Sequence, residues 1–482
     1  MNLGLRYELF SQPVDARDRG SLFSAGTGQF VVPGQSGFTR AIVDGHHKNF
    51  APRFGFAYSA SSKWTVRGGA GVFYGPRSPN QQTTVFGSNP PNAPTVITPS
   101  VSASTTVTPP ITLSSSILVG PTSADLSTFT PANPLGLLIR TADFTNSRPA
   151  LIYQSNLGIQ YQAARDLVLE AAYAWSRGTH LTTRVNLNQI PFDRAMAGFT
   201  TQADRLFPNV GNQVVMDSSM GNNLYNALNL RAEKRMSHGL NFLVNYTWSK
   251  NLESGSGGNR SMSQNGGTTN PLDSWNLHKE KSYSAMDLPH VFVTSAGYEL
   301  PFGKGKPLAS QNPVARAVLG GWQLNGIFSR QSGYPTDIRS GLVAATNQLF
   351  ATFNVPDAVQ GVSMYLPNGG PDGWFNAVAF SQPGQVINAK GTPLTKFGTL
   401  ARRAGRGPGT KDLDFSVFRS FALRERVNLQ FRAEAFNLTN TPAFFLPSAA
   451  SPALTIGNAS FGKLSSSSAT GRQLQLGLKL VF

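Results

Sequence analysis

The segment 472–482, RQLQLGLKLVF, alternates between apolar and polar side chains and ends on an aromatic residue. One parity holds Leu474, Leu476, Leu478, Leu480 and Phe482, and the other holds Gln473, Gln475 and Lys479. Because successive side chains of a strand point to opposite faces, the pattern predicts a strand with one apolar and one polar side. Two-sided strands of this kind occur in soluble sandwiches and in membrane barrels.

Composition argues against membrane-spanning helices and against a disulfide-bonded fold. The 482 residues include 48 Gly, 32 Pro and no Cys, and 13% of them are charged. The chain has no run of about 18 consecutive apolar residues, the length that a spanning helix needs. A ladder of backbone hydrogen bonds can stabilise a membrane-spanning sheet without disulfides.

The same alternation recurs along the whole chain and predicts about twelve strands. It is clearest at 156–161, 168–175, 241–249 and 427–435, where every second residue is mostly apolar or aromatic. The other candidates are 1–10, 52–58, 64–74, 224–234, 290–300, 321–330, 412–419 and 472–482. The chain is therefore predicted to be all-β.

Connections between these strands alternate between short and long. Short turns are expected near 59–63, 162–167, 235–240 and 420–426, with a medium link at 301–319. Long loops are expected at 11–50, 76–150, 176–222, 251–288, 331–410 and 440–471. Outer-membrane barrels have short periplasmic turns and long extracellular loops, whereas compact soluble domains rarely have many loops longer than about 15 residues. The alternation of short and long connections favours an antiparallel transmembrane β-barrel with long extracellular loops.

Two loop segments have a distinctive composition. Residues 88–132 are rich in Pro, Thr and Ser and are expected to be flexible or locally folded. Residues 401–411, ARRAGRGPGTK, form the densest basic stretch of a chain with a net charge of +17. The Arg/Gly mixture occurs in some RNA-binding tails, but this stretch is short and runs into a strand at Leu413. We expect a hydrated loop and no nucleic-acid partner.

The polar parity of the predicted strands supplies the candidate lumen-facing residues. These are Arg53, Arg67, Arg231, Glu233, Arg235, Arg432 and Glu434. Such side chains could contact a plug or an anionic solute, or they could only hydrate and brace a barrel interior. No catalytic residue, metal site or cofactor is predicted.

Aromatic residues of the apolar parity fall near strand ends. They are Tyr74, Trp175, Tyr246 and Trp248. Amphipathic rings at such positions form girdles at the two membrane interfaces, although edge aromatics of a soluble sheet would give the same pattern. We expect these four residues to lie at a membrane interface.

Several runs resemble the carboxyl-terminal barrel of TonB-dependent outer-membrane receptors, in particular their Oar-like branch. The runs are APRFGF at 51–56, SRGTHL at 176–181, YNALNL at 225–230, NYTWSK at 245–250, YELPFGK at 298–304, GGWQLNGIF at 320–328 and AFNLTNTP at 435–442. No single run is diagnostic, but their order and spacing, together with the terminal Phe482, make the resemblance specific. It extends over almost the entire chain.

The resemblance implies a barrel of about 22 strands that is filled by an amino-terminal plug, through which TonB delivers energy. About twelve strands would form only a partial wall of such a barrel. We therefore expect residues 1–482 to be its carboxyl-terminal portion, with the plug domain and the signal peptide absent, because the strand pattern begins at Met1. A half barrel has two unpaired edges, so we expect a gene fragment or a piece of a longer receptor rather than a smaller closed barrel.

The function predicted from these features is that of an outer-membrane receptor and transporter barrel for TonB-dependent uptake of a solute. The solute could be a siderophore, a peptide or an oligosaccharide, and enzymatic activity is not expected. A non-transporting outer-membrane surface or adhesion barrel is the main alternative, and a secreted soluble β-protein is a third hypothesis.

The expected location is the outer membrane of a Gram-negative bacterium, and this location sets the expected partners. Outer-membrane lipid would contact the apolar parity, and external basic residues could pair with lipopolysaccharide phosphates. The barrel assembly machinery would recognise a carboxyl-terminal signal made of Leu478, Leu480 and Phe482. The TonB complex would be reached only through the plug.

Overall fold

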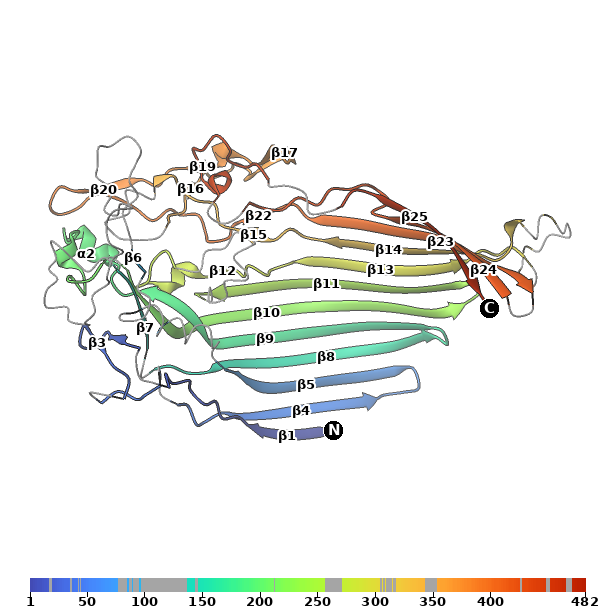
Figure 1. The fold of residues 1–482 in the computed structure, drawn as a ribbon, viewed down its shortest axis with the longest axis horizontal. Helices are drawn as coiled ribbons and strands as arrows, with labels where there is room; N and C mark the ends of the chain where they lie inside the picture. The colour runs from blue at the N-terminus through green and yellow to red at the C-terminus, as the bar shows by residue number, and fades with distance from the viewer. Residues whose placement is uncertain are drawn as a thin grey trace.

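Twelve long strands lie side by side in one twisted sheet in the computed structural model of the chain (Figure 1). The structure describes all residues except 17–19, 35–36, 42, 44, 77–84, 86–88, 90–94, 97–136, 144–145, 212, 256–270, 304–305, 307, 309–313, 315–317, 343–352, 425–426, 448–450 and 465–469. Of the Pro-rich stretch 88–132, only residues 89, 95 and 96 are among those described. The expectation for that stretch therefore lies outside the described residues.

The twelve strands, called the wall below, pair in chain order. They are β1 (Asn2–Tyr7), β4 (Phe50–Ser59), β5 (Trp64–Gly75), β8 (Ala150–Ala164), β9 (Leu167–Asn186), β10 (Val214–Ser237), β11 (Leu240–Ser254), β13 (His290–Glu299), β14 (Trp322–Gln331), β23 (Thr410–Arg424), β24 (Val427–Phe436) and β25 (Gln473–Val481). Each predicted strand corresponds to one of them, so the all-β class and the number of strands are confirmed. All neighbours along the wall are antiparallel, and the described residues add one parallel ladder, between β7 (Leu137–Ala142) and β10.

The wall is open at both edges. In the part of the chain that the structure describes, β1 pairs only with β4 and β25 pairs only with β24. All residues of β1 are exposed, and so are all residues of β25 except Gly477. A full row of backbone donors and acceptors therefore remains available at each edge.

The connections alternate in length as predicted. The four predicted short turns join strands at one end of the wall, the turn end, where both chain termini also lie (Figure 1). The long connections lie at the other end, the loop end. The turn expected at 420–426 begins too early, because β23 continues to Arg424 and β24 begins at Val427. The largest boundary error lies elsewhere: β9 continues to Asn186 and β10 begins at Val214, so the connection expected at 176–222 spans only 187–213.

This error has a local cause. His180 has a φ of 55°, and the pairing of β9 with β10 shifts register on both sides of Gly221. These irregularities interrupt the apolar–polar alternation from which strands are recognised. Spanning a membrane takes about 9–11 residues of strand, and β9 and β10, with 20 and 24 residues, are about twice that length.

The register assigns every wall residue to one of two faces, because directly paired residues lie on the same side of a sheet. One row reads Tyr58, Val66, Ile159, Ala171, Leu230, Tyr246, Phe292, Arg330 and Lys411. It starts at the turn end of β4 and reaches the loop end of β23. This stagger is what tilted strands in a barrel require.

The face that carries this row, called the apolar face, is hydrophobic over most of its area. It includes Leu3, Leu5, Phe54, Leu157, Leu169, Tyr173, Leu228, Val244, Phe328, Leu413, Phe431, Leu476 and Leu478. The opposite, polar face carries mainly Arg, Glu, Asn, Gln, Ser, Thr and Gly. Many large apolar side chains remain exposed on the apolar face, for example Leu157, Trp248 and Leu476, at 51%, 57% and 76%.

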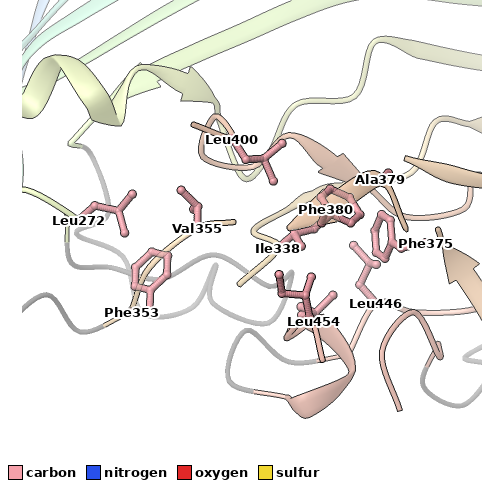
Figure 2. Close-up of a cluster of buried hydrophobic side chains, with 11 residues drawn as sticks. Leu272, Ile338, Phe353, Val355, Phe375, Ala379, Phe380, Leu400, Leu446 and Leu454 are labelled. Atoms are coloured by element: carbon pink, nitrogen blue, oxygen red, sulfur yellow. The ribbon is translucent and has the colours of Figure 1, made fainter. Parts of the chain in front are cut away.

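The buried hydrophobic cores of the molecule lie in the connections at the loop end and not between layers of the wall. The largest core takes residues from three connections: Leu272, Ile338, Phe353, Val355, Phe375, Ala379, Phe380, Leu400, Leu446, Leu454 and Ile456 (Figure 2). A smaller core joins Ile190 and Ala195 to Leu394. The connections 187–213, 255–289, 332–409 and 437–472, where described, thus pack into one body, called the loop cap below.

The elements of the connections are short. The strands are β2 (Leu22–Ser24), β3 (Gln29–Val31), β6 (Thr95–Val96), β12 (Ser282–Tyr283), β15 (Pro335–Thr336), β16 (Asp357–Ala358), β17 (Tyr365–Gly370), β18 (Gly373–Phe375), β19 (Phe380–Ser381), β20 (Gln385–Ile387), β21 (Pro393–Thr395) and β22 (Gly405–Arg406). The helical turns are α2 (Phe192–Met196), η1 (Gln202–Asp204), η3 (Leu277–Glu280), η5 (Ala377–Ala379) and η6 (Pro452–Leu454). Among the described residues, none of the helices has the length and hydrophobicity to cross a membrane.

We predict that an Arg substitution on the apolar face costs far more than one on the polar face. Val244→Arg in β11 should lower the free energy of unfolding in lipid vesicles by about 2–4 kcal/mol, because the charge would enter hydrocarbon. Asn245→Arg, the next residue on the same strand, is the matched control and should cost well under half as much. Urea titration measures both values, and equal costs would contradict the assignment of faces.

Candidate functional site

The register places the predicted lumen-facing residues on the polar face. Strand pairing assigns six of the seven to that face: Arg53, Arg67, Arg231, Glu233, Arg432 and Glu434. Arg235 follows Lys234, the last residue of β10 in regular register, and its amide donates a hydrogen bond to the Asp166 carbonyl oxygen at 2.8 Å.

These residues form separate small groups rather than one site. The Arg231 guanidinium lies 2.6 Å from the Glu233 carboxylate and 3.9 Å from that of Glu170. Arg53 lies over the Phe73 ring at 4.5 Å. These contacts are on different strands, and exposed ion pairs of this kind contribute about 0–1 kcal/mol each. They make the polar face hydrophilic but do not outline a binding pocket.

The predicted interface aromatics lie on the apolar face. Tyr74, at the loop end of β5, donates a hydrogen bond to the Lys48 carbonyl oxygen at 3.3 Å. Tyr246 and Trp248 lie in the part of β11 that pairs with the first residues of β13, and Trp175 has the same facing in β9. The four residues thus share one face and lie toward the loop end, and their place at a membrane interface stays a prediction.

A second aromatic group on the apolar face was missed in the sequence. Tyr58, Trp64 and Tyr161 lie at the turn ends of three successive strands, and the rings of Trp64 and Tyr161 stack at 4.3 Å. Their even spacing from the short turns is the signal that could have identified them.

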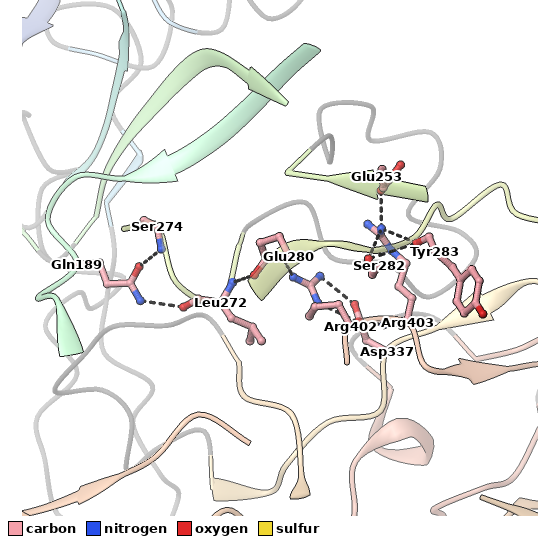
Figure 3. A network of polar contacts seen from close by, with 10 residues as sticks. All are labelled: Gln189, Glu253, Leu272, Ser274, Glu280, Ser282, Tyr283, Asp337, Arg402 and Arg403. Atoms are coloured by element: carbon pink, nitrogen blue, oxygen red, sulfur yellow. Dashed lines mark hydrogen bonds and ion pairs between the residues drawn. The ribbon is translucent and has the colours of Figure 1, made fainter. Parts of the chain in front are cut away.

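The loop cap is held together by a buried network of charged side chains (Figure 3). Arg402 donates two hydrogen bonds to Asp337, Nε to Oδ1 at 2.9 Å and Nη2 to Oδ2 at 3.0 Å. Its Nη1 donates to Glu280, whose other oxygen accepts a hydrogen bond from the Leu272 amide at 2.6 Å. Side chains of Arg402, Asp337 and Glu280 are 2%, 0% and 6% exposed. One guanidinium thus joins the connection 255–289 to the connection 332–409.

The adjacent Arg403 ties the same loops to the wall. Its backbone amide donates to Asp337 at 2.8 Å, and its guanidinium donates to Glu253 on β11 and to the Tyr283 carbonyl oxygen. The φ of Arg403 is 51°, a conformation that non-glycine residues rarely adopt. Neighbouring arginines therefore point to different partners.

These contacts correct the interpretation of 401–411 as a hydrated loop. Arg402 and Arg403 are buried, and Arg406 forms an ion pair with Asp287 at 2.5 Å. The acidic partners of these arginines are distant in the sequence. Glu280, Glu253 and Asp287 each lie more than a hundred residues before the arginine that they bind. A single sequence gives no signal for ion pairs over such separations.

The charges of the network shift the pKa values of its carboxyl groups. Burial alone would raise the pKa of Asp337, but the charge and hydrogen bonds of Arg402 outweigh burial and lower the pKa to about 2. For Glu280 the balance is reversed, because burial raises the pKa more than Arg402 lowers it. Asp337 is accordingly the anion that anchors the two arginines.

A further connection enters the network through Gln189, in the connection 187–213. The Gln189 amide group donates to the Leu272 carbonyl oxygen at 2.8 Å and accepts from the Ser274 amide at 2.7 Å. At the loop ends of β9 and β10, buried Arg184 and Asp217 pair at 3.0 Å. The cap is thus a fixed surface above the sheet. Within the described segments, no group of three or more His, Cys, Asp or Glu side chains is placed to hold a metal ion.

The carboxyl-terminal residues are freely accessible. Leu478 and Leu480 on the edge strand β25 are 70% and 52% exposed, and Phe482, which follows β25, is 93% exposed.

We predict that acid loosens the loop cap through Asp337. Its lowered pKa contributes stability that is complete above the ordinary pKa of 3.8 and is lost as the pH falls toward 2, about 2 kcal/mol in all. Hydrogen-exchange protection of residues 396–406 should fall over this range. In Asp337→Asn the protection should be lower at neutral pH and should change less between pH 4 and 2. Equal pH profiles for the two proteins would contradict this role of Asp337.

Comparison with known proteins gives one family match. A family model described as "Outer membrane beta barrel domain" matches residues 1–475. No curated protein matches the chain.

Solved structures with some similarity include the FrpB iron transporter from Neisseria meningitidis (F3-3 variant), at 12% identity over 89% of this chain and 39% of that one, with a TM-score of 0.37. FpvA of P. aeruginosa bound to heterologous pyoverdines has 9% identity over 90% and 33%, with a TM-score of 0.38. The transporter YddB from Escherichia coli has 8% identity over 91% and 41%, with a TM-score of 0.38. The chain thus spans 33–41% of the length of these proteins. TM-scores this low bear on neither fold nor function.

Proposed function

The chain belongs to the outer membrane beta barrel domain family, and from this premise we propose that it forms part of the wall of a receptor that binds and imports a solute. The location that follows from this membership is the outer membrane of a Gram-negative bacterium. A secreted soluble β-protein is not consistent with it. The apolar face is then the lipid face, the polar face lines the lumen, and the loop cap lies outside the cell.

The open wall is the observation that supports a larger barrel. Strands β1 and β25 each leave one edge unpaired, while both carry apolar side chains suited to lipid. An unsatisfied backbone group in hydrocarbon costs several kcal/mol, so neither edge can remain open in the membrane. We propose that further strands cover both edges and complete a barrel of about 22 strands.

The sequence runs that resemble the Oar-like branch of TonB-dependent receptors support the mode of transport. In this proposal the loop cap presents the solute-binding surface, and Arg53, Arg67, Arg231, Glu233, Arg235, Arg432 and Glu434 line the path or brace it. Contact with TonB is made by a plug domain that lies outside these 482 residues. We propose no catalytic step and no cofactor.

The cap argues for binding at a preformed surface. Buried ion pairs and a shared hydrophobic core hold at least four connections in one arrangement. A preformed surface loses little conformational entropy when a ligand binds. Siderophores, peptides and oligosaccharides are all large and polar enough to use such a surface.

We predict TonB-dependent uptake. Strains with and without this gene, each with and without TonB, should be compared for uptake of labelled siderophores, peptides and oligosaccharides. The proposal expects at least one solute whose uptake needs both the gene and TonB. Uptake that needs the gene but is unchanged without TonB would contradict energised import. A surface or adhesion barrel, the alternative function, would instead show gene-dependent binding to surfaces and no uptake.

The exposed carboxyl terminus supports recognition by the barrel assembly machinery. Leu478, Leu480 and Phe482 form an apolar strand end that pairs with β24 on one side, and another strand can bind its open side by β-addition. We predict that Phe482→Ala lowers the amount of protein assembled in the outer membrane several-fold, measured as the heat-modifiable form on gels. Lys479→Ala, on the polar face of β25, is the control and should assemble normally. Equal assembly of the two variants would exclude this signal.

A further inference from the structure

A groove opens on the apolar face at the loop ends of β11, β13, β14 and β23. Its cavity volume is about 870 Å³. The lining includes Tyr246, His290, Phe292, Phe328, Arg330 and Lys411. The Tyr246 hydroxyl and the His290 Nδ1 are hydrogen-bonded at 2.8 Å, which fixes two of these rings against each other. Aromatic side chains and cations thus lie together at the loop-end boundary of the apolar face.

Arg330, Arg406 and Lys411 are the cations that line the groove, and Arg406 is paired with Asp287. The other two lie directly opposite each other. Arg330 on β14 and Lys411 on β23 are register partners, and both are exposed. Like charges in directly opposite positions repel, with Cβ atoms about 5 Å apart. In the part of the chain that the structure describes, neither side chain belongs to an ion pair. An anion bound between them would turn this repulsion into attraction.

The distribution of charge over the wall is one-sided. Carboxylates of the regularly paired strands lie on the polar face: Glu170, Glu233, Glu253, Glu299, Asp412, Asp414 and Glu434. Cations on the apolar face near the loop end are Arg177, Lys250, Arg330 and Lys411. At the turn end, by contrast, Lys234 is paired with Asp166. The loop end of the lipid face is therefore a positive rim.

From these observations we propose that this groove binds the phosphorylated headgroup of a glycolipid in the outer leaflet. The proposal rests on the orientation given under the proposed function, with the loop cap outside the cell. The next row of the apolar face toward the turn end reads Val244, Thr294, Phe328 and Leu413. Acyl chains can lie along this row while phosphate oxygens accept hydrogen bonds from Arg330 and Lys411. A free phosphate would use only the cations and leave the aromatic surface uncovered.

A second groove on the same rim has the same chemistry. Its volume is about 700 Å³, and Tyr153, Trp175 and Arg177 line it from the apolar face of β8 and β9. A guanidinium that forms no ion pair among the described residues lies next to two aromatic rings there, and β9 is five strands nearer to the amino-terminal edge than β23. The positive rim therefore offers at least two places for lipid headgroups.

The test measures binding of bisphosphorylated lipid A to the detergent-purified protein by native mass spectrometry. Arg330→Gln/Lys411→Gln should weaken binding about tenfold or more, which is the loss of at least one charge-assisted hydrogen bond. Each single variant should lose part of that affinity. Lys63→Gln/Arg165→Gln removes the same two charges at the turn end and should bind as the unaltered protein does.

Two comparison ligands separate the sources of binding. The same lipid without phosphates should bind at least about tenfold more weakly, and inorganic phosphate at equal concentration should not compete. Unchanged affinity of the Arg330→Gln/Lys411→Gln variant, or equal binding of the dephosphorylated lipid, would overturn the proposal. Competition by inorganic phosphate would overturn the choice of a lipid. The assay does not depend on TonB, so failure of uptake and failure of this site are distinguishable.

Discussion

Every backbone amide and carbonyl inside a bilayer must find a partner in the protein, and this requirement organises the wall. Ten of the twelve strands satisfy it on both sides through neighbours in chain order. The edge strands β1 and β25 satisfy it on one side only. Because unpaired groups are so costly in hydrocarbon, a sheet of this kind is stable in a membrane only as part of a closed barrel. The proposal of a larger receptor follows from that imbalance.

The loop cap is stabilised by different interactions from those of the wall. Outside the membrane, hydrophobic burial and ion pairs can be used, and the cap contains the cores that the wall lacks. Arg402 is shared between Asp337 and Glu280, so removing Arg402 leaves two buried carboxylates without their common cation, at a cost of about 3–5 kcal/mol. Long connections thereby become a surface of fixed shape. Ligand binding at that surface and lipid contact at the wall use separate parts of the chain.

The wall could be predicted from the sequence because its determinants are local. Alternation with period two identified all twelve strands, including 472–482, and the turn lengths gave their grouping. The prediction failed where the structure depends on residues that are distant in the sequence or on irregular pairing. These places are the cap and the pairing around Gly221. The burial of Arg402 depends on Glu280 and Asp337, 122 and 65 residues away. From composition alone, residues 401–411 were predicted to be a hydrated loop, because runs of arginine and glycine are usually exposed to solvent.

Single cysteines along β11 test the central assignment most directly, since the chain has no Cys of its own. Positions 242–247 would be substituted one at a time, and each protein would be labelled in lipid nanodiscs with a water-soluble, membrane-impermeant thiol reagent. The account predicts labelling at Leu243, Asn245 and Thr247 and protection at Phe242, Val244 and Tyr246. Labelling without a period of two, or with the opposite parity, would contradict a wall with one lipid face and one aqueous face.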